Sequence, residues 1–289
     1  MKRSKVYVPG LILAGSAFLF SCKKTDLVAE GTTEVTNKKA EACELVAFRN
    51  NIISSTGSQY IFQKQLDPAT GKLRQITAGV YQGGVITSIA TFNVHWNAGS
   101  VAFTDAAATS DTVLIVSLNA TGRAADVAAG NKPNVNYLPT SFEYSNNKLA
   151  VMKISLAGKY LTSRFVYDDK DNCVAINDDQ QASEIPGRVE FTYDNKKADQ
   201  QVYFDEPRPF SWNTYSLLQF SGFFPELQPS NLRTGVKVYW GNNYKAYDVQ
   251  LINHQLNKGK LTKYEVSFGG SNPTIDQYAE WICNDASKN

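Results

Sequence analysis

Residues 142–153, FEYSNNKLAVMK, contain the pattern that decides the fold. Phe142 and Tyr144 alternate with polar residues, and the polar stretch 145–148 separates them from a second run that begins at Leu149. A repeat of two is the periodicity of a strand with one apolar face. Asn supplies the left-handed backbone conformations that tight turns need. The segment therefore predicts a β-hairpin.

The same pattern recurs along the rest of the chain. Comparable units occupy residues 60–75, 165–176, 189–197, 236–243 and 247–268. One apolar and one polar face is typical of antiparallel strands rather than parallel ones. We therefore predict a mostly β protein, a large antiparallel meander of hairpins that forms an open curved sheet or a sandwich.

Helix signals are few. Residues 214–224 could hold one or two helical turns, and residues 274–283 fit either a helix or an edge strand. We therefore expect at most one or two short helices. No proline-rich or glycine/serine-rich stretch divides residues 41–289, and all-β domains can reach that length as one unit. The sequence predicts a single antiparallel β domain over this range.

The N-terminal residues resemble a lipoprotein export signal. Lys2, Arg3 and Lys5 give a positive start, residues 6–20 are mostly apolar or small, and LFSC at 19–22 resembles a lipobox. The apolar stretch is shorter than the roughly 20 residues that a membrane-spanning helix needs. We expect residues 1–21 to be a signal peptide and Cys22 to carry the lipid, with acyl chains such as palmitate. The alternative is an ordinary signal peptide with an incidental cysteine.

The residues after the expected cleavage site are polar. Together with the lipidated cysteine, they form a predicted flexible tether over residues 22–40. Position +2 is Lys23 rather than Asp, which favours the outer membrane by resemblance to Gram-negative sorting rules. We expect a lipid-anchored outer-membrane protein. Whether its domain faces the periplasm or the medium stays open.

Charge excludes one class of partner. Removing residues 1–21 deletes three basic and no acidic residues, so the 29 basic residues become 26, against 27 acidic. A near-neutral mature chain has no electrostatic footprint for nucleic acid. The expected partners are the membrane, through the N-terminal lipid, and a glycan or a protein. No motif indicates a cofactor.

Three cysteines remain after lipidation. Cys43 opens the first predicted strand and Cys283 closes the last, so a disulfide between them is one candidate pairing; three reduced, buried cysteines are the alternative. A metal site is not expected, because there is no CxxC and the only histidines are His95 and His254.

Several hairpins share a loose sequence pattern. It consists of an aromatic residue, any residue and Tyr, followed by Asp or Ser with Asn or Lys. It is seen in FEYSNNKL (142–149), FVYDDKDN (165–172) and FTYDNKK (191–197). This sequence pattern resembles the tyrosine–aspartate (YD or RHS-type) hairpin repeat. The mature chain resembles a Gram-negative lipoprotein family of unknown function built from such hairpins. Such proteins carry a cysteine-led first strand, as in 43–48, and an aromatic–proline insertion, comparable to 204–224. The resemblance implies a fold and a location, and no catalytic residues. Ser145 replaces the expected Asp in one unit.

Two kinds of candidate site remain. The acidic clusters at 168–171 and 178–179 could form a glycosidase pair, but both lie in predicted turns, where Asp bonds its own backbone. Exposed aromatic side chains are the better candidates for binding, above all Trp212 in an irregular segment, and also Trp240.

We therefore expect no catalytic residues and a non-catalytic binding or scaffold role in the envelope, with a glycan or a protein as ligand. The alternatives are a hydrolase that acts on envelope or environmental polysaccharide and a purely structural envelope protein.

Overall fold

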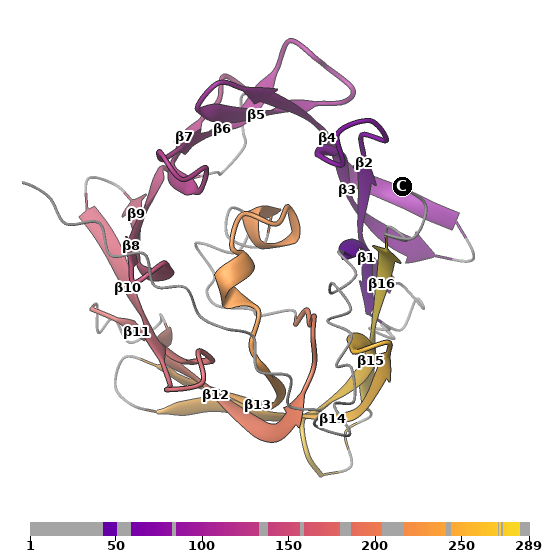
Figure 1. The fold of residues 1–289 in the computed structure, drawn as a ribbon, viewed down its shortest axis with the longest axis vertical. Coiled ribbons are helices and arrows are strands. Elements are labelled where there is room, and N and C mark those ends of the chain that lie inside the picture. Colours follow the sequence, from indigo (N-terminus) through magenta and orange to yellow (C-terminus); the bar gives the residue numbers. More distant parts are fainter. Residues whose placement is uncertain are drawn as a thin grey trace, which may run out of the picture. The chain divides into compact units, whose positions relative to one another are not determined.

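Antiparallel β-strands follow one another around a ring in the computed structural model of the chain (Figure 1). The structure describes residues 43–50, 59–82, 85–132, 138–156, 159–179, 186–203, 217–240, 244–270, 272 and 274–283. All of these residues belong to one compact unit, which is assigned to Glu41–Asn289. The signal peptide, Cys22 and the tether lie outside the described residues.

The strands of the described part, in chain order, are β1 (Cys43–Asn50), β2 (Gln59–Leu66), β3 (Leu73–Gln82), β4 (Val85–Asn97), β5 (Ser100–Asp105), β6 (Thr112–Leu118), β7 (Ala124–Ala129), β8 (Thr140–Ser145), β9 (Lys148–Leu156), β10 (Lys159–Tyr167), β11 (Cys173–Asp178), β12 (Pro186–Lys197), β13 (Asn231–Trp240), β14 (Lys245–Asn257), β15 (Lys260–Ser267) and β16 (Ile275–Cys283). One short 3₁₀-helix, η1 (Pro225–Leu227), precedes β13. Residues 274–283, which fit a helix or a strand by sequence, include β16.

The sheet closes on itself, so the prediction of an open curved sheet or a sandwich is wrong. Every strand pairs with its sequence neighbours, and β1 pairs with β16, which makes a closed barrel. Phe48 lies opposite Ala279 across the closing seam, and Cys43 lies opposite Cys283. Closure gives hydrogen-bond partners to both edges that an open sheet would expose. Local periodicity cannot reveal this pairing, because it joins residues more than 200 positions apart.

The wall of the barrel is apolar on its inner face. On β4, Phe92 and Val94 are buried, whereas Asn93 and His95 point to the outer face. The alternation that predicted hairpins therefore also separates the lumen from the exterior. Lys64 on β2 is an inward-facing exception: burial lowers the pKa of its amine, and Nζ lies 3.9 Å from Oε2 of Glu44.

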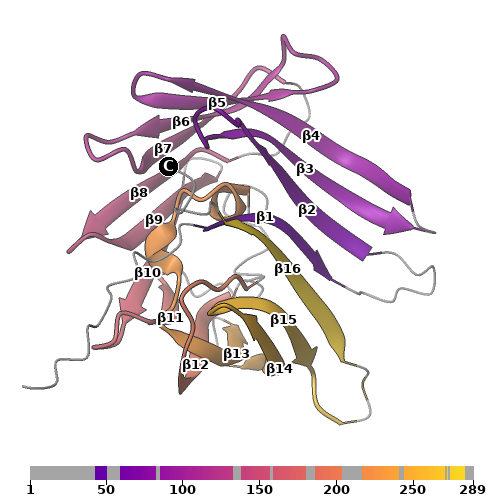
Figure 2. The same ribbon diagram turned by 45° about the vertical axis from the view of Figure 1, so that its right-hand side comes forward.

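A chain segment fills the lumen. We call residues 198–230, which link β12 to β13, the inner segment, of which residues 198–203 and 217–230 are described. Both views place the described residues 217–230, drawn in orange, inside the ring of strands (Figures 1 and 2). The phenylalanines of the inner segment contact the wall. Phe220 stacks on Phe62 with ring centroids 4.4 Å apart, and Phe224 meets Phe142 edge-on at 5.0 Å. A barrel of this strand number encloses more space than its own side chains fill, so these rings complete the core.

A repeated contact ties neighbouring hairpins together. An aromatic side chain donates a hydrogen bond to a backbone carbonyl in the first two residues of the preceding strand. The pairs are Trp96 to Leu73, Tyr144 to Ala124, Tyr167 to Leu149, Tyr193 to Cys173, and Trp281 to Leu261. Lys72, Arg123 and Lys148 lie over the rings of the first three. These clasps give the recurring aromatic residue at the end of a strand a structural role.

The clasps and the chain ends share one end of the barrel. Because turns of a meander alternate between the two ends, the turns 67–72, 119–123, 168–172 and 258–259 lie at the same end as Cys43 and Cys283. We call this end the cysteine rim and the other the opposite rim. Cys43 and Cys283 are joined by a disulfide, so a covalent bond closes the seam there.

Replacing both Cys43 and Cys283 with serine is expected to lower the free energy of unfolding by about 2–5 kcal/mol, because the bond restricts the unfolded chain over nearly the whole domain. Urea denaturation measures the change as a lower midpoint. Dithiothreitol should lower the midpoint of the unmodified protein and leave that of the double variant unchanged. Equal midpoints for both proteins under oxidising conditions would contradict this role.

Candidate functional site

Buried polar side chains attach the inner segment to the wall at the cysteine rim. Asn172, which is 1% exposed, accepts hydrogen bonds from the backbone N–H groups of Ser230 and Asn231 at 2.8 and 3.1 Å. Its side-chain amide donates to Asp168 Oδ2 and Asn231 Oδ1. One amide therefore joins the β10–β11 turn to the C-terminal end of the inner segment, and buried polar groups paired in this way fix a single arrangement.

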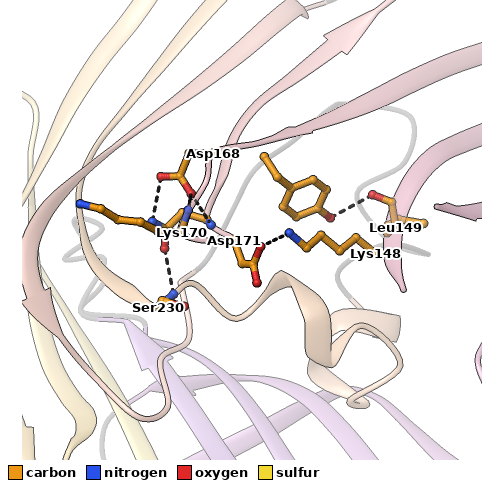
Figure 3. A network of polar contacts seen from close by, with 8 residues as sticks. Lys148, Leu149, Asp168, Lys170, Asp171 and Ser230 are labelled. Carbon is orange, nitrogen blue, oxygen red and sulfur yellow. Dashed lines mark hydrogen bonds and ion pairs between the residues drawn. The ribbon is translucent and has the colours of Figure 1, made fainter. Parts of the chain in front are cut away.

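Figure 3 shows this junction from close by. Asp168 Oδ1 accepts hydrogen bonds from the backbone N–H groups of Lys170 and Asn172, which closes the turn. Lys148 of the neighbouring hairpin pairs with Asp171 in the same turn. Burial alone would raise the pKa of Asp168, but the hydrogen bonds from Asn172 and Lys170 outweigh it and lower the pKa. The carboxylate is thus committed to holding the turn.

The N-terminal end of the inner segment is attached by Gln201. Its side-chain amide donates to the carbonyls of Pro229 and Asn231, and its Oε1 accepts from the Tyr203 hydroxyl at 2.6 Å. The Tyr203 oxygen in turn accepts from the backbone N–H of Arg233. The two ends of the segment are therefore bonded to each other as well as to β13. An occupant anchored at both ends is part of the native fold.

A buried guanidinium lies beside this network. Arg233 is 2% exposed, and its Cζ lies 4.0 Å from the ring centroid of Phe191 and 4.8 Å from that of Tyr203. Tyr193 completes the group of rings at 5.8 Å. Aromatic faces stabilise a cation that is withdrawn from water. Arg233 thus connects the wall to the inner segment through both its backbone and its side chain.

His254 lies next to these rings, on the inner side of β14. Its ring stacks near Tyr264 at 6.2 Å and meets Tyr203 edge-on at 6.5 Å. Burial lowers the pKa of the imidazole, against the opposing effect of a hydrogen bond with the Arg233 backbone. The neutral ring is therefore the form that the folded protein favours. The other histidine, His95, lies on the outer wall, where its Nε2 is 2.9 Å from Thr104 Oγ1.

The outer wall carries ion pairs in the middle of strands. Lys153 pairs with Glu143, and Arg164 forms two hydrogen bonds with Asp179. Further outward pairs join Arg188 to Glu190, Lys263 to Asp276, and Arg49 to Glu280. A barrel that spans a bilayer has the reverse distribution, with an apolar outer band and a polar lumen, and Arg or Lys on its lipid face costs about 2–4 kcal/mol at the bilayer midplane. This exterior suits water.

The described part of the chain contains only some of the residues that the sequence singled out. Cys22 and Trp212 lie outside the described residues. Trp240 ends β13 half-buried at the opposite rim, and its backbone N–H donates to the Tyr244 carbonyl. Cys173 is a free, buried cysteine whose Sγ lies 3.6 Å from the Ala175 carbonyl oxygen.

The two acidic clusters lie at opposite ends of β11. The cluster at 168–171 belongs to the cysteine rim, and the cluster at 178–179 to the opposite rim. A six-residue strand spans about 20 Å, whereas a pair of glycosidase carboxylates lies within about 10 Å. These clusters cannot act as one catalytic pair. Within the described residues, no group of three or more His, Cys, Asp or Glu side chains could hold a metal ion.

Sequence reasoning did not identify Asn172, Gln201 or Arg233. Asn172 looked like a turn residue, and Gln201 stands in a polar stretch between predicted strands. Arg233 stands at a polar position of the alternation that Leu232, Val236 and Val238 define, so no local pattern marked it as buried.

These observations define a closed antiparallel barrel with an occupied lumen and a polar exterior. Among solved structures, the chain is similar to a porin-like protein from Bacteroides uniformis ATCC 8492, with a TM-score of 0.63 and 15% identity over 83% of this chain and 97% of that chain. It is also similar to a porin-like protein from Bacteroides vulgatus ATCC 8482, with a TM-score of 0.53 and 10% identity over 83% and 98%. At these identities the likeness shows the fold. No family model and no curated protein matches the chain. None of the described helices is both long and apolar enough to cross a membrane.

Replacing Asn172 with alanine is expected to lower the free energy of unfolding by at least about 2 kcal/mol, because two backbone N–H groups lose a buried acceptor. Chemical denaturation measures the loss. Asn131→Ala is the matched control, since the Asn131 side chain accepts one hydrogen bond from Thr112 at an exposed site. Equal losses for the two variants would show that the junction does not hold the inner segment.

His254 makes stability depend on pH. Its pKa is lowered in the folded protein, so the unfolded chain binds the proton more readily, and stability is full above about pH 6.5 and falls below it. We expect the melting temperature to drop between pH 7.5 and 5, and His254→Gln to reduce that drop. An identical drop for His254→Gln and the unmodified protein would rule out this contribution.

Proposed function

We propose that the chain is an outer-membrane lipoprotein, held by lipid on Cys22, whose barrel stands in water as a closed, non-catalytic binding or scaffold module. The observation that carries the proposal is the direction of the wall: apolar residues face a lumen filled by the inner segment, and ion pairs face outward. A channel across a bilayer needs the opposite arrangement.

The solved neighbours support the envelope as the location. Both are described as porin-like proteins, and both share this barrel over most of their length. The sequence supports the manner of attachment, through the lipobox-like LFSC at 19–22 and the polar residues that follow it. Conduction does not follow from the shared fold, because Phe220, Phe223 and Phe224 occupy the lumen.

Lipid attachment has a direct test. Cells fed an alkyne analogue of palmitate should label the unmodified chain and a Cys173→Ala variant, but not a Cys22→Ala variant. Cys22→Ala should also move the protein from the membrane fraction to the soluble fraction, because the polar outer wall of the barrel cannot hold the protein in the membrane once the lipid is lost. Retention of Cys22→Ala in carbonate-washed membranes would mean that the barrel itself is embedded.

Conduction is tested separately. The purified mature chain, added to a planar lipid bilayer, should give no discrete conductance steps above the protein-free baseline. Stable steps of uniform size would overturn the proposal of a closed module.

A further inference from the structure

The outer wall is divided into a charged part and an uncharged part. The outer-wall ion pairs of the described residues lie on β8 to β16 and on β1. From β2 to β6, the described outward side chains that have a register partner carry no Lys, Arg, Asp or Glu; the exposed Arg74 of β3 lies at a bulge next to Gln75. The outward residues are Gln63, Gln65, Gln75, Thr77, Thr91, Asn93, His95, Asn97, Ser100, Ala102, Thr104, Thr112, Ile115 and Ser117. We call these residues the neutral face.

The neutral face is arranged in rows that cross the strands. Gln65, Gln75, Asn93 and Thr104 are successive register partners on four neighbouring strands, and Gln63, Thr77 and Thr91 form a second row. Gln75 Nε2 donates to Asn93 Oδ1 at 2.9 Å, and the hydroxyls of Thr77 and Thr91 lie 3.2 Å apart. Neighbours in a row lie about 4.8 Å apart, and successive rows about 7 Å apart. The rows therefore form a regular array of amides and hydroxyls on the outer wall.

From this arrangement we propose that the neutral face is a docking surface for an uncharged polysaccharide. The proposal rests on the proposed function and names the ligand class of the binding module. Surfaces that lose water on binding are poor in charge, because burying an unpaired charge is costly, whereas charged surfaces keep a protein soluble. The ion pairs lie on the remaining strands of the wall, as expected if the charged part keeps the protein soluble and the neutral face binds the ligand.

The chemistry of the face selects the occupant. Amides and hydroxyls carry both donors and acceptors, as sugar hydroxyls do. The face offers no cation for an acidic polymer and no anion for a basic one. A protein partner or a second copy would need the buried aromatic and Arg anchors that dominate protein interfaces, and none of the listed side chains is of these types. A neutral, hydroxyl-rich polymer laid along the rows is the match.

Affinity electrophoresis in native gels tests the proposal with the full mature chain. The probes are dextran, galactomannan, xyloglucan and mixed-linkage β-glucan, with polygalacturonate as the acidic comparison. We expect retardation by at least one neutral polymer and none by polygalacturonate. Gln75→Ala/Asn93→Ala should weaken that retardation at least tenfold. The isosteric Asn93→Asp should do the same by adding a charge without changing volume.

The matched control is Thr192→Ala/Gln250→Ala, which removes outward polar side chains from β12 and β14 on the charged part of the wall. It should bind as the unmodified protein does, and equal melting temperatures establish that all variants fold. Absence of retardation by every neutral polymer, retardation by polygalacturonate alone, or equal losses in variant and control would each overturn the proposal. Dimerisation in sedimentation that Gln75→Ala/Asn93→Ala abolishes would assign the face to a second copy instead.

This test is independent of the tests of the closed module. Suppose that no polymer binds, that Cys22 is lipidated and that the bilayer shows no conductance steps. The proposal of a closed lipoprotein is then retained, and the proposal of a glycan ligand is wrong. Conductance steps would remove the closed module whatever the gels show.

Discussion

The packing of the inner segment into the lumen is the interaction on which the rest of the structure depends. A barrel with this many strands is too wide for its own side chains to fill, so without an occupant its apolar inner wall would meet water. Phe220, Phe223 and Phe224 supply the missing surface, and the wall meets them with Phe62, Trp96 and Phe142. The core of this protein therefore lies inside the ring.

The polar attachments follow from that packing. A segment that enters and leaves the lumen carries backbone N–H and C=O groups out of contact with water, and each needs a partner. Asn172 and Gln201 provide those partners at the two ends of the segment. The aromatic clasps strengthen the same rim by joining neighbouring hairpins. The cysteine rim is thus the place where the wall, the inner segment and the disulfide hold together.

The apolar lumen also determines the character of the exterior. Strand side chains alternate, so a wall that turns Phe and Val inward must turn its polar residues outward. The barrel shares its strand arrangement with porin-like proteins, yet the direction of its polarity suits water. The likeness in fold therefore does not by itself fix the environment of the barrel, because an apolar lumen and a polar outer wall are the reverse of a barrel that spans a bilayer. The remaining distinction, between the neutral face and the charged wall, comes from the choice among polar residues.

Much of the local structure could be predicted from the sequence. The stretch 142–153 becomes β8, a turn and β9, with Asn146 and Asn147 at positive φ as tight turns require. Asp168 holds its own turn, as the turn interpretation of the acidic cluster predicts. The helical signal in 214–224 corresponds to a single turn at 217–220 inside the lumen. Each of these features depends on residues close together in the chain.

Closure, the occupied lumen and the polar network could not be predicted in that way. The pairing of β1 with β16 brings together residues such as Phe48 and Ala279, and no local pattern distinguishes a paired outer strand from an edge strand. Gln201 and Asn172 meet the backbone about 30 and 60 residues away, so their roles exist only after the chain has folded. The sequence by itself determined the strands, the turns and which side chains share a face, because these depend on backbone preference and a period of two. Only the tertiary structure decided which face became the inside, because that depends on how the whole sheet curves and what fills it.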